Sequence, residues 1–335
     1  MICIAVDAMG GDFGPRTTVP ASIESLKQDD NLKIVLFGDQ AQISPYLASI
    51  PPVIKKRLSI VHCEQVVAMS DKPSFALRHK KSSSMRQAIE YLHQGKADGC
   101  VSAGNTGALM GIGCYVLKTY PGIDRPAICT AIPTLGGHSY LLDLGANVDT
   151  NSDNLYQFAL MGSVLASAVD GLHKPRVALL NIGEEEVKGN GQVKHASALL
   201  SAQGEINYTG YVEGDHLFSG VADVIVCDGF VGNIALKTSE GVVKFIASLS
   251  EQMFGGGAVS KLLMAAVKPL FDRLQARIDP QQYNGAYFLG LQGLVVKSHG
   301  NANVEGFVQA ISSAGHCIKK DMVVLMEERL DELLP

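Results

Sequence analysis

The chain has 335 residues and a formal net charge of −5, and 47% of its residues are hydrophobic against 18% charged. This balance excludes a disordered protein, which needs low hydrophobicity and high net charge. The acidic balance argues against an evenly basic nucleic-acid binder, so we expect no nucleic-acid partner. Seven cysteines without a CxxC pair are typical of reduced thiols in a cytoplasmic protein.

Short runs rich in valine and isoleucine alternate with helical patterns along the chain. The expected strands are 2–7, 33–37, 59–63, 98–102, 127–132, 140–144, 176–182, 223–228 and 294–298, and the expected helices include 84–95, 106–118, 152–169, 188–203 and 303–334. Apolar strands that alternate with helices predict an α/β fold with a parallel or mixed sheet covered on both faces. Because no low-complexity linker or internal repeat is evident, we expect one α/β/α catalytic domain over residues 1–335.

The segment 233–279 breaks this alternation and predicts a protruding helical hairpin. Its two apolar stripes flank Gly255, Gly256 and Gly257 with no strand between them, and Pro269 is expected to kink the second arm. The arms could pack against the rest of the domain or a dimer mate. Apolar residues close to the glycines, Phe254, Val259, Leu262, Leu263 and Met264, make membrane or partner contact an equally open alternative for the tip.

Glycine-rich loops follow several of the expected strands, where open α/β sheets bind their ligands. The loops are 7–12, 102–107, 144–149, 181–190, 228–233 and 298–301. Two of them, at 104–107 and 229–233, lead into helices and so predict sites for a phosphate-sized anion. Ordinary turns with Asn or Thr helix caps are the alternative interpretation.

Familiar nucleotide and metal motifs fit poorly. The first loop lacks GxGxxG, and Asp12 within it would repel a pyrophosphate, so a dinucleotide site is disfavoured. The segment from Gly232 to Thr238 lacks the glycine that precedes the lysine of a phosphate-binding loop. The nine histidines are scattered without metal-ligand spacing, so no metal site is predicted.

Two basic features could serve an anionic substrate or partner. Lys188 follows three consecutive acids, a pattern usually found in a solvated turn, yet its place after a strand could let it meet a phosphate or a developing oxyanion. The run Arg78–Lys81 precedes an expected helix and could meet an acidic partner. His299 follows the last expected strand. A histidine there could be catalytic, or it could make only a structural hydrogen bond, which is the more common role.

Seven motifs, taken in order, closely resemble those of the phosphate acyltransferase (PlsX) family of bacterial phospholipid synthesis. They are DAMGGD at 7–12, SAGNTGALM at 102–110, RPAICTAIPT at 125–134, LLDLGANVD at 141–149, NIGEEEVKGN at 181–190, GYVEGD at 210–215 and CDGFVGNIALKTSEG at 227–241. The resemblance implies a Rossmann-like three-layer α/β/α sandwich related to phosphate acetyltransferases and to isocitrate and isopropylmalate dehydrogenases.

The same resemblance implies transfer of a fatty acyl group from acyl carrier protein to inorganic phosphate. The acyl phosphate would then pass to a membrane glycerol-3-phosphate acyltransferase. It also implies a homodimer that is cytoplasmic and peripherally attached to the inner face of the cell membrane. A short-chain phosphotransacylase acting on acyl-CoA and a non-catalytic anion-binding scaffold are the alternatives.

Phosphate dianion is a nucleophile near neutral pH and a thiolate is a fair leaving group, so we expect no cofactor. Lys188 and Asn233 match family positions thought important for activity. We expect Lys188 to help hold phosphate and Asn233 or His299 to stabilise the oxyanion or leaving sulfur. Asp7 and Asp12 are expected to orient the loops. The predicted binding residues are Asp7, Gly10, Gly11, Asp12, Ser102, Gly104, Asn105, Thr106, Asn147, Asp228 and Gly232.

An acidic carrier would need a local basic patch, for which the candidates are Arg78–Lys81, Lys261, Lys268, Arg273 and Arg277.

Overall fold

A computed structural model of the chain describes residues 1–254 and 280–334. The eleven strands in these ranges form one sheet in the order β3-β2-β1-β4-β11-β10-β5-β6-β9-β7-β8. Their bounds are β1 Ile2–Asp7, β2 Leu32–Gly38, β3 Leu58–His62, β4 Gly99–Ser102, β5 Ala127–Thr134, β6 Gly137–Leu142, β7 Arg176–Leu180, β8 Asn207–Val212, β9 Val224–Val226, β10 Ala286–Leu289 and β11 Leu294–Lys297.

The sheet is mixed, in agreement with the sequence-based expectation. The strands β3, β2, β1, β4 and β11 pair in parallel, and so do β6, β9, β7 and β8. Between these two blocks, β10 runs antiparallel to both β11 and β5, and β5 pairs with β6 as an antiparallel hairpin. Strands at the middle of the sheet therefore come from distant parts of the chain.

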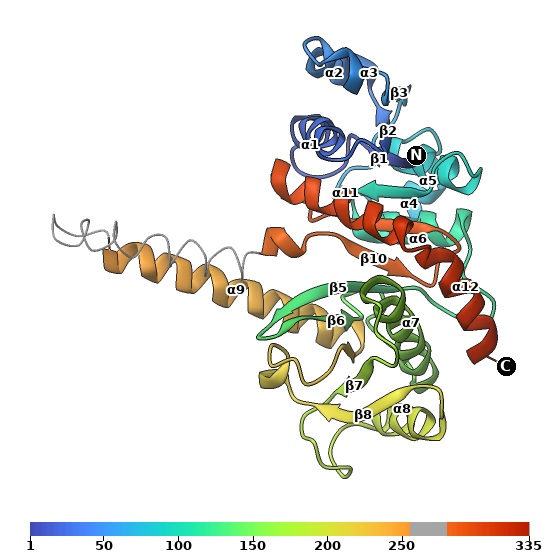
Figure 1. Cartoon of the computed structure of the whole chain (residues 1–335), viewed down its shortest axis with the longest axis vertical. Helices are drawn as coiled ribbons and strands as arrows, with labels where there is room; N and C mark the ends of the chain where they lie inside the picture. The colour runs from blue at the N-terminus through green and yellow to red at the C-terminus, as the bar shows by residue number, and fades with distance from the viewer. Residues whose placement is uncertain (255–279, 335) are drawn as a thin grey trace.

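Helices cover both faces of the sheet (Figure 1), which confirms the predicted α/β/α fold. One layer contains α1 Pro15–Gln28, α7 Ser152–Asp170, α8 Gly191–Ala202, α11 Val304–Lys319 and α12 Met322–Leu333. The other contains α4 Pro73–His79, α5 Ser84–His93 and α6 Thr106–Val116. Side chains of each layer join a separate apolar cluster against the sheet: Phe158 and Phe307 belong to one, Ile89 and Ile112 to the other. The short helices α2 Gln40–Ile43, η1 Ser44–Leu47 and α3 Pro52–Lys55 lie near β3.

The structure differs from the expected elements at four places. Strands β8 and β10 were not expected, because the first is polar and at an edge and the second has only four residues. The predicted helix 303–334 is two helices, α11 and α12, separated where Asp321 adopts a left-handed φ of 50°. The helix predicted from residue 188 begins later, at Gly191, because the side chain of Asn190 accepts the N–H of Val193 and caps it.

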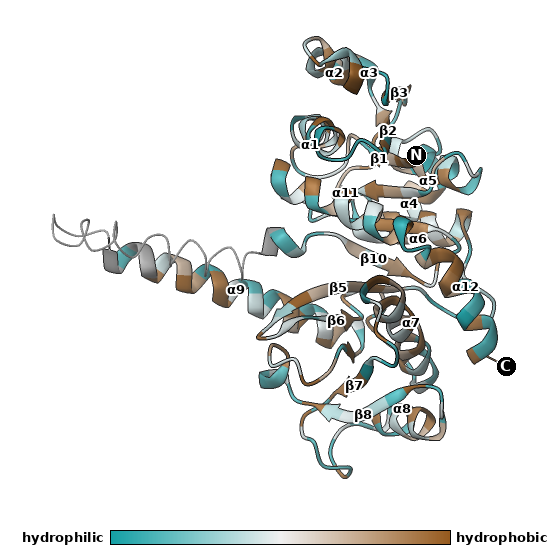
Figure 2. Ribbon diagram, viewed as in Figure 1, coloured by the Kyte–Doolittle hydropathy of each residue, from teal (hydrophilic) through white to brown (hydrophobic). Residues whose placement is uncertain are grey.

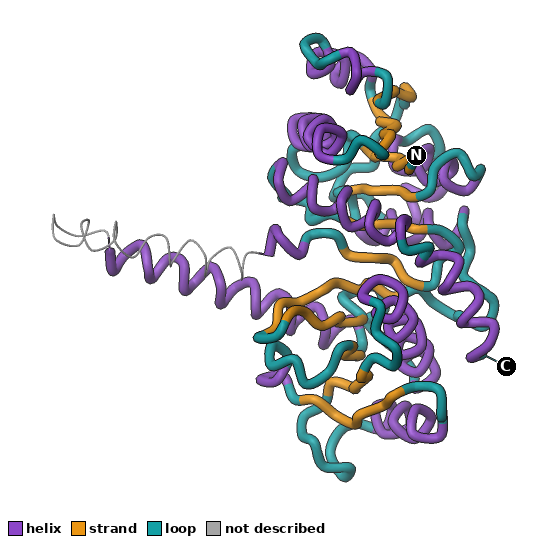
Figure 3. Tube along the Cα trace, in the orientation of Figure 1, coloured by secondary structure: helices purple, strands orange, loops and turns teal. Residues whose placement is uncertain are grey.

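The first arm of the predicted hairpin is α9, Gly229–Phe254, which extends away from the body of the protein (Figures 1 and 3). Apolar bands alternate along it (Figure 2), and its residues Val242, Phe245 and Leu249 are exposed. The tip, Pro269, the second arm and the basic residues Lys261, Lys268, Arg273 and Arg277 lie outside the described residues. In the ranges 1–254 and 280–334, no helix is both long and apolar enough to cross a bilayer.

Candidate active site

Three polar residues form a single row across neighbouring strands. Asp7 of β1 pairs with Ser102 of β4, and Ser102 pairs with Lys297 of β11. Each lies two residues after a side chain buried in the same apolar cluster, namely Ala5, Cys100 and Val295. Since side chains alternate along a strand, all three members of the row face the layer that contains α5 and α6. Asp7 and Ser102 are predicted site residues, whereas no pattern in the sequence pointed to Lys297.

Ser102 connects two of the predicted loops. Its Oγ donates to Oδ2 of Asp7 at 2.7 Å and accepts the N–H of Gly104 at 3.0 Å, while Oδ1 of Asp7 accepts the N–H of Met9 at 3.3 Å. Burial raises the pKa of Asp7, and these hydrogen bonds oppose the rise. The bonding supports a role for Asp7 in holding the loops.

Glycine allows these loops to approach one another closely. A Cβ on Gly10 would lie 2.7 Å from both Oδ2 of Asp7 and the nitrogen of Gly104. Gly11 has a φ of 86°, and the next residue, Asp12, donates its N–H to the carbonyl of Gly300 at 2.8 Å. The structure therefore brings together the loops 7–12, 102–107 and 298–301, three of the six that the sequence singled out.

Asn105 is occupied by structural hydrogen bonds. Its Oδ1 accepts the N–H of Ala108 and caps α6, and its Nδ2 donates to the carbonyls of Met69 and Asp71 at 2.9 Å. It thus holds the chain before α4 against the beginning of α6. Thr106 is the first residue of that helix and is half-buried. Backbone N–H groups in the first turn of a helix lack intrahelical acceptors and can meet an anion.

Lys297 is a buried cation with an exposed fraction of only 9%. Its Nζ donates to the carbonyl of Ala103 at 3.3 Å and to that of Ser298. No carboxylate of the described residues lies within 4.0 Å of it. Burial lowers the pKa of Lys297 to about 8, against the opposing effect of Asp7 and Asp12, and Lys237 adds to the lowering.

His299 contacts the α9 helix. Its Nε2 lies 3.1 Å from Nζ of Lys237, whose ammonium also donates to Glu240 at 2.8 Å. Its backbone N–H donates to Oδ1 of Asn284 at 2.9 Å. Burial lowers the pKa of His299, and the neighbouring Lys237 adds to this, so the ring is neutral near pH 7. A neutral ring that accepts at Nε2 carries its proton on Nδ1.

A second cluster surrounds the beginning of α9. Asp143 is fully buried and accepts the N–H groups of Ile128 at 2.9 Å and Asn147 at 2.7 Å, as well as Nδ2 of Asn147 at 2.9 Å. Burial raises the pKa of Asp143, and these bonds oppose the rise. The carbonyl of Asn147 accepts the N–H of Gly229 at 2.8 Å. Asn147, a predicted binding residue, therefore joins the loop after β6 to the first residue of α9.

The glycines of this cluster provide space for close contact. A Cβ on Gly232 would lie 2.0 Å from the carbonyl oxygen of Asp143, and one on Gly145 would lie 3.5 Å from Cγ of Asn233. The N–H of Gly232 donates to the carbonyl of Asp228, and Oδ1 of Asp228 accepts the N–H of Val231. These groups are therefore already bonded within the first turn of α9. The side chain of Asn233 is exposed and can contact a ligand.

The α9 helix connects the two clusters. Asn233 lies against Gly145 in the second cluster, and Lys237 contacts His299 in the first. Residues four apart in a helix share one face, so Asn233 and Lys237 are neighbours on that face. The structure thus places the predicted residues Asn233 and His299 along one stretch of surface, with Lys237 between them.

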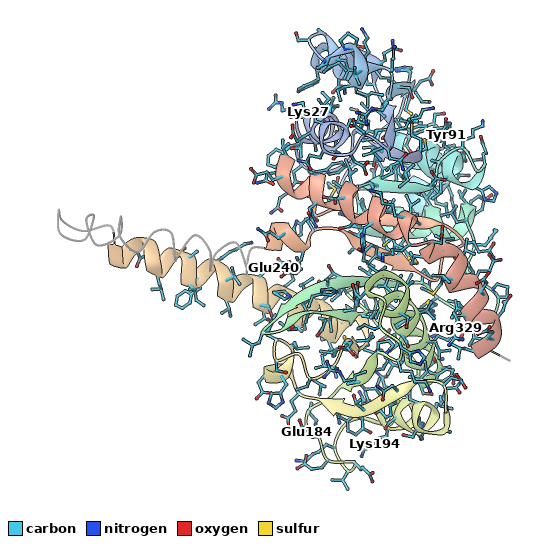
Figure 4. All side chains as sticks on the ribbon, viewed as in Figure 1. Lys27, Tyr91, Glu184, Lys194, Glu240 and Arg329 are labelled. Atoms are coloured by element: carbon cyan, nitrogen blue, oxygen red, sulfur yellow. The ribbon has the colours of Figure 1, made fainter. Side chains whose placement is uncertain are left out.

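Lys188 belongs to a different part of the molecule. Its backbone N–H donates to Glu185, its side chain is exposed, and no hydrogen bond or ion pair joins it to either cluster among the described residues. Figure 4 shows Glu184, from the same loop, near the lower end of the view, well apart from Glu240 on α9. A hollow of about 550 Å³ lies beside this loop, and its lining includes Glu184, Glu186, Ser197 and Tyr208.

Four residues of the two clusters were not predicted from the sequence: Lys237, Asn284, Lys297 and Asp143. Lys237 and Asp143 lie within the motifs 227–241 and 141–149. The local sequence does not show toward which part of the protein either side chain points. Lys297 lies within the expected strand 294–298, whose neighbours in the sheet are set by pairing over long sequence distances. Among the described residues, no group of three His, Cys, Asp or Glu side chains is arranged to hold a metal ion.

Comparison with known proteins agrees with this organisation. Residues 2–325 match a family model described as "Fatty acid synthesis protein". A protein named "Phosphate acyltransferase" from Pseudomonas putida strain F1 is 54% identical over 99% of this chain and 98% of its own length. One of the same name from Halorhodospira halophila is 52% identical over 99% of this chain and 97% of its own.

Solved structures share the fold at low sequence identity. A phosphotransacetylase from Streptococcus pyogenes superposes with a TM-score of 0.63 at 17% identity, covering 95% of this chain and 94% of its own. A 4-hydroxythreonine-4-phosphate dehydrogenase from Burkholderia phymatum gives 0.51 at 13% identity, with coverage of 94% and 98%. The expected relation to phosphate acetyltransferase and dehydrogenase folds is confirmed. On the family model and the similarity to its curated relatives, the chain belongs to the phosphate acyltransferase (PlsX) family.

Proposed function

We propose that this protein transfers an acyl group from a thioester to inorganic phosphate and so forms an acyl phosphate. The names of the relatives support this activity. The structural observation that carries it is the contact between Lys237 and His299, which joins the glycine-rich cluster at Asp7 and Ser102 to the cluster at Asn233. This surface combines cations, amide groups and closely approaching backbone, as positioning of a small anion requires.

The reaction needs only groups of this kind. An oxygen of phosphate attacks the thioester carbonyl carbon and forms a C–O bond, and the carbonyl oxygen becomes an oxyanion. When the carbonyl re-forms, the C–S bond breaks and its electron pair leaves on sulfur as a thiolate. Free thiols have a pKa of about 8.5, so the thiolate is a reasonable leaving group near neutral pH. We propose that the side-chain amide of Asn233 donates to the oxyanion, with His299 as the alternative donor.

The donor we propose is a long-chain acyl group on acyl carrier protein. The basic run at the end of α4 supports this, because Arg78, His79 and Lys81 are exposed, as is Lys72 immediately before the helix. The contacts of Asn105 hold the chain before α4 beside the beginning of α6, so an acidic carrier bound there would lie next to the glycine-rich loops. A short-chain phosphotransacylase acting on acyl-CoA would not need this surface.

Further parts of the proposal rest on the resemblance and the sequence. They are a homodimer, delivery of the acyl phosphate to a membrane glycerol-3-phosphate acyltransferase, and peripheral membrane contact through the hairpin tip. Liposome binding tests the last: Leu263→Glu is expected to abolish it, because a buried charge opposes insertion of an apolar tip. Unchanged binding by this variant would remove the membrane proposal.

One assay tests the activity and separates its alternatives. Purified protein is incubated with phosphate and either long-chain acyl carrier protein or acetyl-CoA, and acyl phosphate is trapped as the hydroxamate with hydroxylamine. We expect hydroxamate from the carrier-linked donor, dependent on phosphate. Product from acetyl-CoA alone would favour the short-chain enzyme, and none from either donor would favour a non-catalytic scaffold. Near wild-type rates in folded Lys188→Ala would remove Lys188 from the proposed site.

A further inference from the structure

We propose that Lys297 is the residue that binds phosphate in this site, with Lys237 as a second cation and Asp12 as an acceptor for a proton carried by the anion. The inference deepens the proposed function and rests on it for the choice of ligand. It assigns phosphate binding to a buried lysine at the end of β11, in place of the exposed Lys188 that the sequence suggested.

Lys297 forms no direct ion pair with the described residues, and Asp7 and Asp12 act on its charge only from beyond 4.0 Å. Two of its three N–H donors meet the carbonyls of Ala103 and Ser298. The third has no acceptor among the described residues, and no carboxylate of those residues lies within 4.0 Å. A buried ammonium without a counter-ion is costly, because it has lost its hydration without gaining a charge partner. A bound anion would supply that partner.

The position of Lys297 matches the loops that suit an anion. Its register partner is Ser102, whose hydroxyl holds Gly104, and its own ammonium contacts Ala103. The lysine therefore lies beneath the loop that leads into α6. Lys237 of α9 contacts His299, two residues after Lys297, at 3.1 Å, and its charge adds to the lowering of the pKa of Lys297. Because Lys237 keeps its ion pair with Glu240, a bound anion would chiefly stabilise the charge of Lys297.

The neighbouring carboxylates decide which anion fits. Asp7 is engaged by Ser102 and Met9, whereas Asp12 is exposed and no side-chain hydrogen bond or ion pair to it is found among the described residues. Hydrogen phosphate carries a proton that can be donated to a carboxylate. Sulfate has the same shape and charge but no proton near neutral pH. Its oxygens would therefore be repelled by the carboxylate of Asp12. The site is therefore expected to prefer phosphate to sulfate.

Calorimetric titration with inorganic phosphate near pH 7 tests the assignment. In Lys297→Met, the dissociation constant for phosphate is expected to rise about 10- to 100-fold, the range for loss of a charged hydrogen-bond donor. Lys297→Arg should lose less, because it keeps the charge. The matched control is Lys320→Met, which removes an exposed lysine at the far end of α11 and should leave phosphate binding unchanged. Sulfate should bind wild type at least tenfold more weakly than phosphate, and Asp12→Asn should narrow that difference.

Stability separates a binding role from a structural one. If Lys297 binds the anion, removing a buried charge that has no direct ion pair should leave the melting temperature of the phosphate-free protein unchanged or raise it. A folded Lys297→Met protein with unchanged phosphate affinity would overturn the inference, and so would wild type that shows no saturable phosphate binding. Sulfate binding as tight as phosphate would overturn the role of Asp12.

A second measurement applies to wild type and needs no variant. Acetylation of lysines by acetic anhydride, mapped by mass spectrometry, should be slowed by phosphate at Lys297 and unaffected at Lys320. Absence of protection at Lys297 would also overturn the inference. Both measurements report binding without turnover, so a failure of acyl transfer in the hydroxylamine assay would be distinguishable from a failure of this assignment.

Discussion

Nζ of Lys237 lies 3.1 Å from Nε2 of His299, although the two residues are 62 positions apart in the chain. Lys237 belongs to the helix that follows β9, and His299 follows β11, so the contact connects the two parallel blocks of the sheet. Asn233 lies one helical turn before Lys237 on the same face. The proposed site therefore depends on the placement of α9 as much as on the residues that contact substrate.

Close packing at the beginning of α9 should be sensitive to a single methyl group. In Gly232→Ala, the added Cβ would lie 2.0 Å from the carbonyl oxygen of Asp143, so the helix must shift and the free energy of unfolding should fall by about 1–3 kcal/mol. Acyl transfer should fall with it, because Asn233 and Lys237 move too. Chemical denaturation and the hydroxamate assay measure the two effects.

Gly241→Ala in the same helix is the matched control. A Cβ there meets nothing within 4 Å, so alanine should stabilise the helix by up to about 1 kcal/mol and leave activity unchanged. Equal stability changes in the two variants would contradict the packing described for Gly232.

Asn233 should act on turnover more than on phosphate binding. If its side chain donates to the oxyanion that forms during acyl transfer, Asn233→Ala should lower kcat about 10²- to 10³-fold with little change in KM for phosphate. Thr238→Ala, an exposed substitution on the same helix, should change neither constant. A large rise in KM with unchanged kcat would instead assign Asn233 to substrate binding.

The hydrogen bonds of Ser102 should contribute measurably to stability. Ser102→Ala leaves the N–H of Gly104 and a carboxylate oxygen of Asp7 without their present partner, which should cost about 1–3 kcal/mol. Ser312→Ala on α11, where the side chain is exposed, should cost less than about 0.5 kcal/mol. Thermal or urea unfolding measures the loss of unfolding free energy in both variants. Equal losses would contradict a stabilising role for the hydrogen bonds of Ser102.

Lys297 should make stability depend on pH. Its pKa is about 8 in the folded protein and 10.5 as an ordinary lysine, so between these values the unfolded chain binds more protons than the folded one. The contribution of Lys297 to the free energy of unfolding therefore becomes more favourable as pH rises from 8 to 10.5, by on the order of 3 kcal/mol at most.

Buried thiols act in the opposite direction over the same range, because burial raises the pKa of Cys63 to about 11 and also raises that of Cys227. The measurement is therefore the difference in unfolding free energy between wild type and Lys297→Met at pH 7, 8 and 9. Both proteins contain these thiols, so their effect cancels. We expect any advantage of the methionine variant to shrink as pH rises, and a difference that is constant with pH would contradict the lowered pKa.

Local patterns predicted much of the sheet and its loops. The apolar run at 2–7 became β1 with unchanged bounds, and the loop ending at Thr106 does precede a helix with Asn105 as its cap. These features depend on alternation, glycine and capping residues that are adjacent in sequence. The α/β/α arrangement followed from them.

Features that depend on pairing between distant strands could not be predicted from local sequence patterns. The row of Asp7, Ser102 and Lys297 exists because β11 inserts beside β4, nearly 200 residues away in sequence. The antiparallel β10, which separates the two parallel blocks, is too short for its pattern to stand out. Lys188 lies in a loop that follows a strand and Lys297 is the last residue of a strand, so a lysine near a strand end could be exposed or buried and only the arrangement in space distinguishes the two.

Oxygen-18-labelled phosphate tests the central claim most directly. The protein is incubated with long-chain acyl carrier protein and labelled phosphate, and the acyl product is identified by mass spectrometry before any trapping. We predict an acyl phosphate in which all phosphate oxygens, including the one bonded to the acyl carbon, carry the label, formed at a rate that saturates with phosphate and falls in Asn233→Ala. An unlabelled free fatty acid, formed at a rate independent of phosphate, would show that water is the acceptor and contradict the claim.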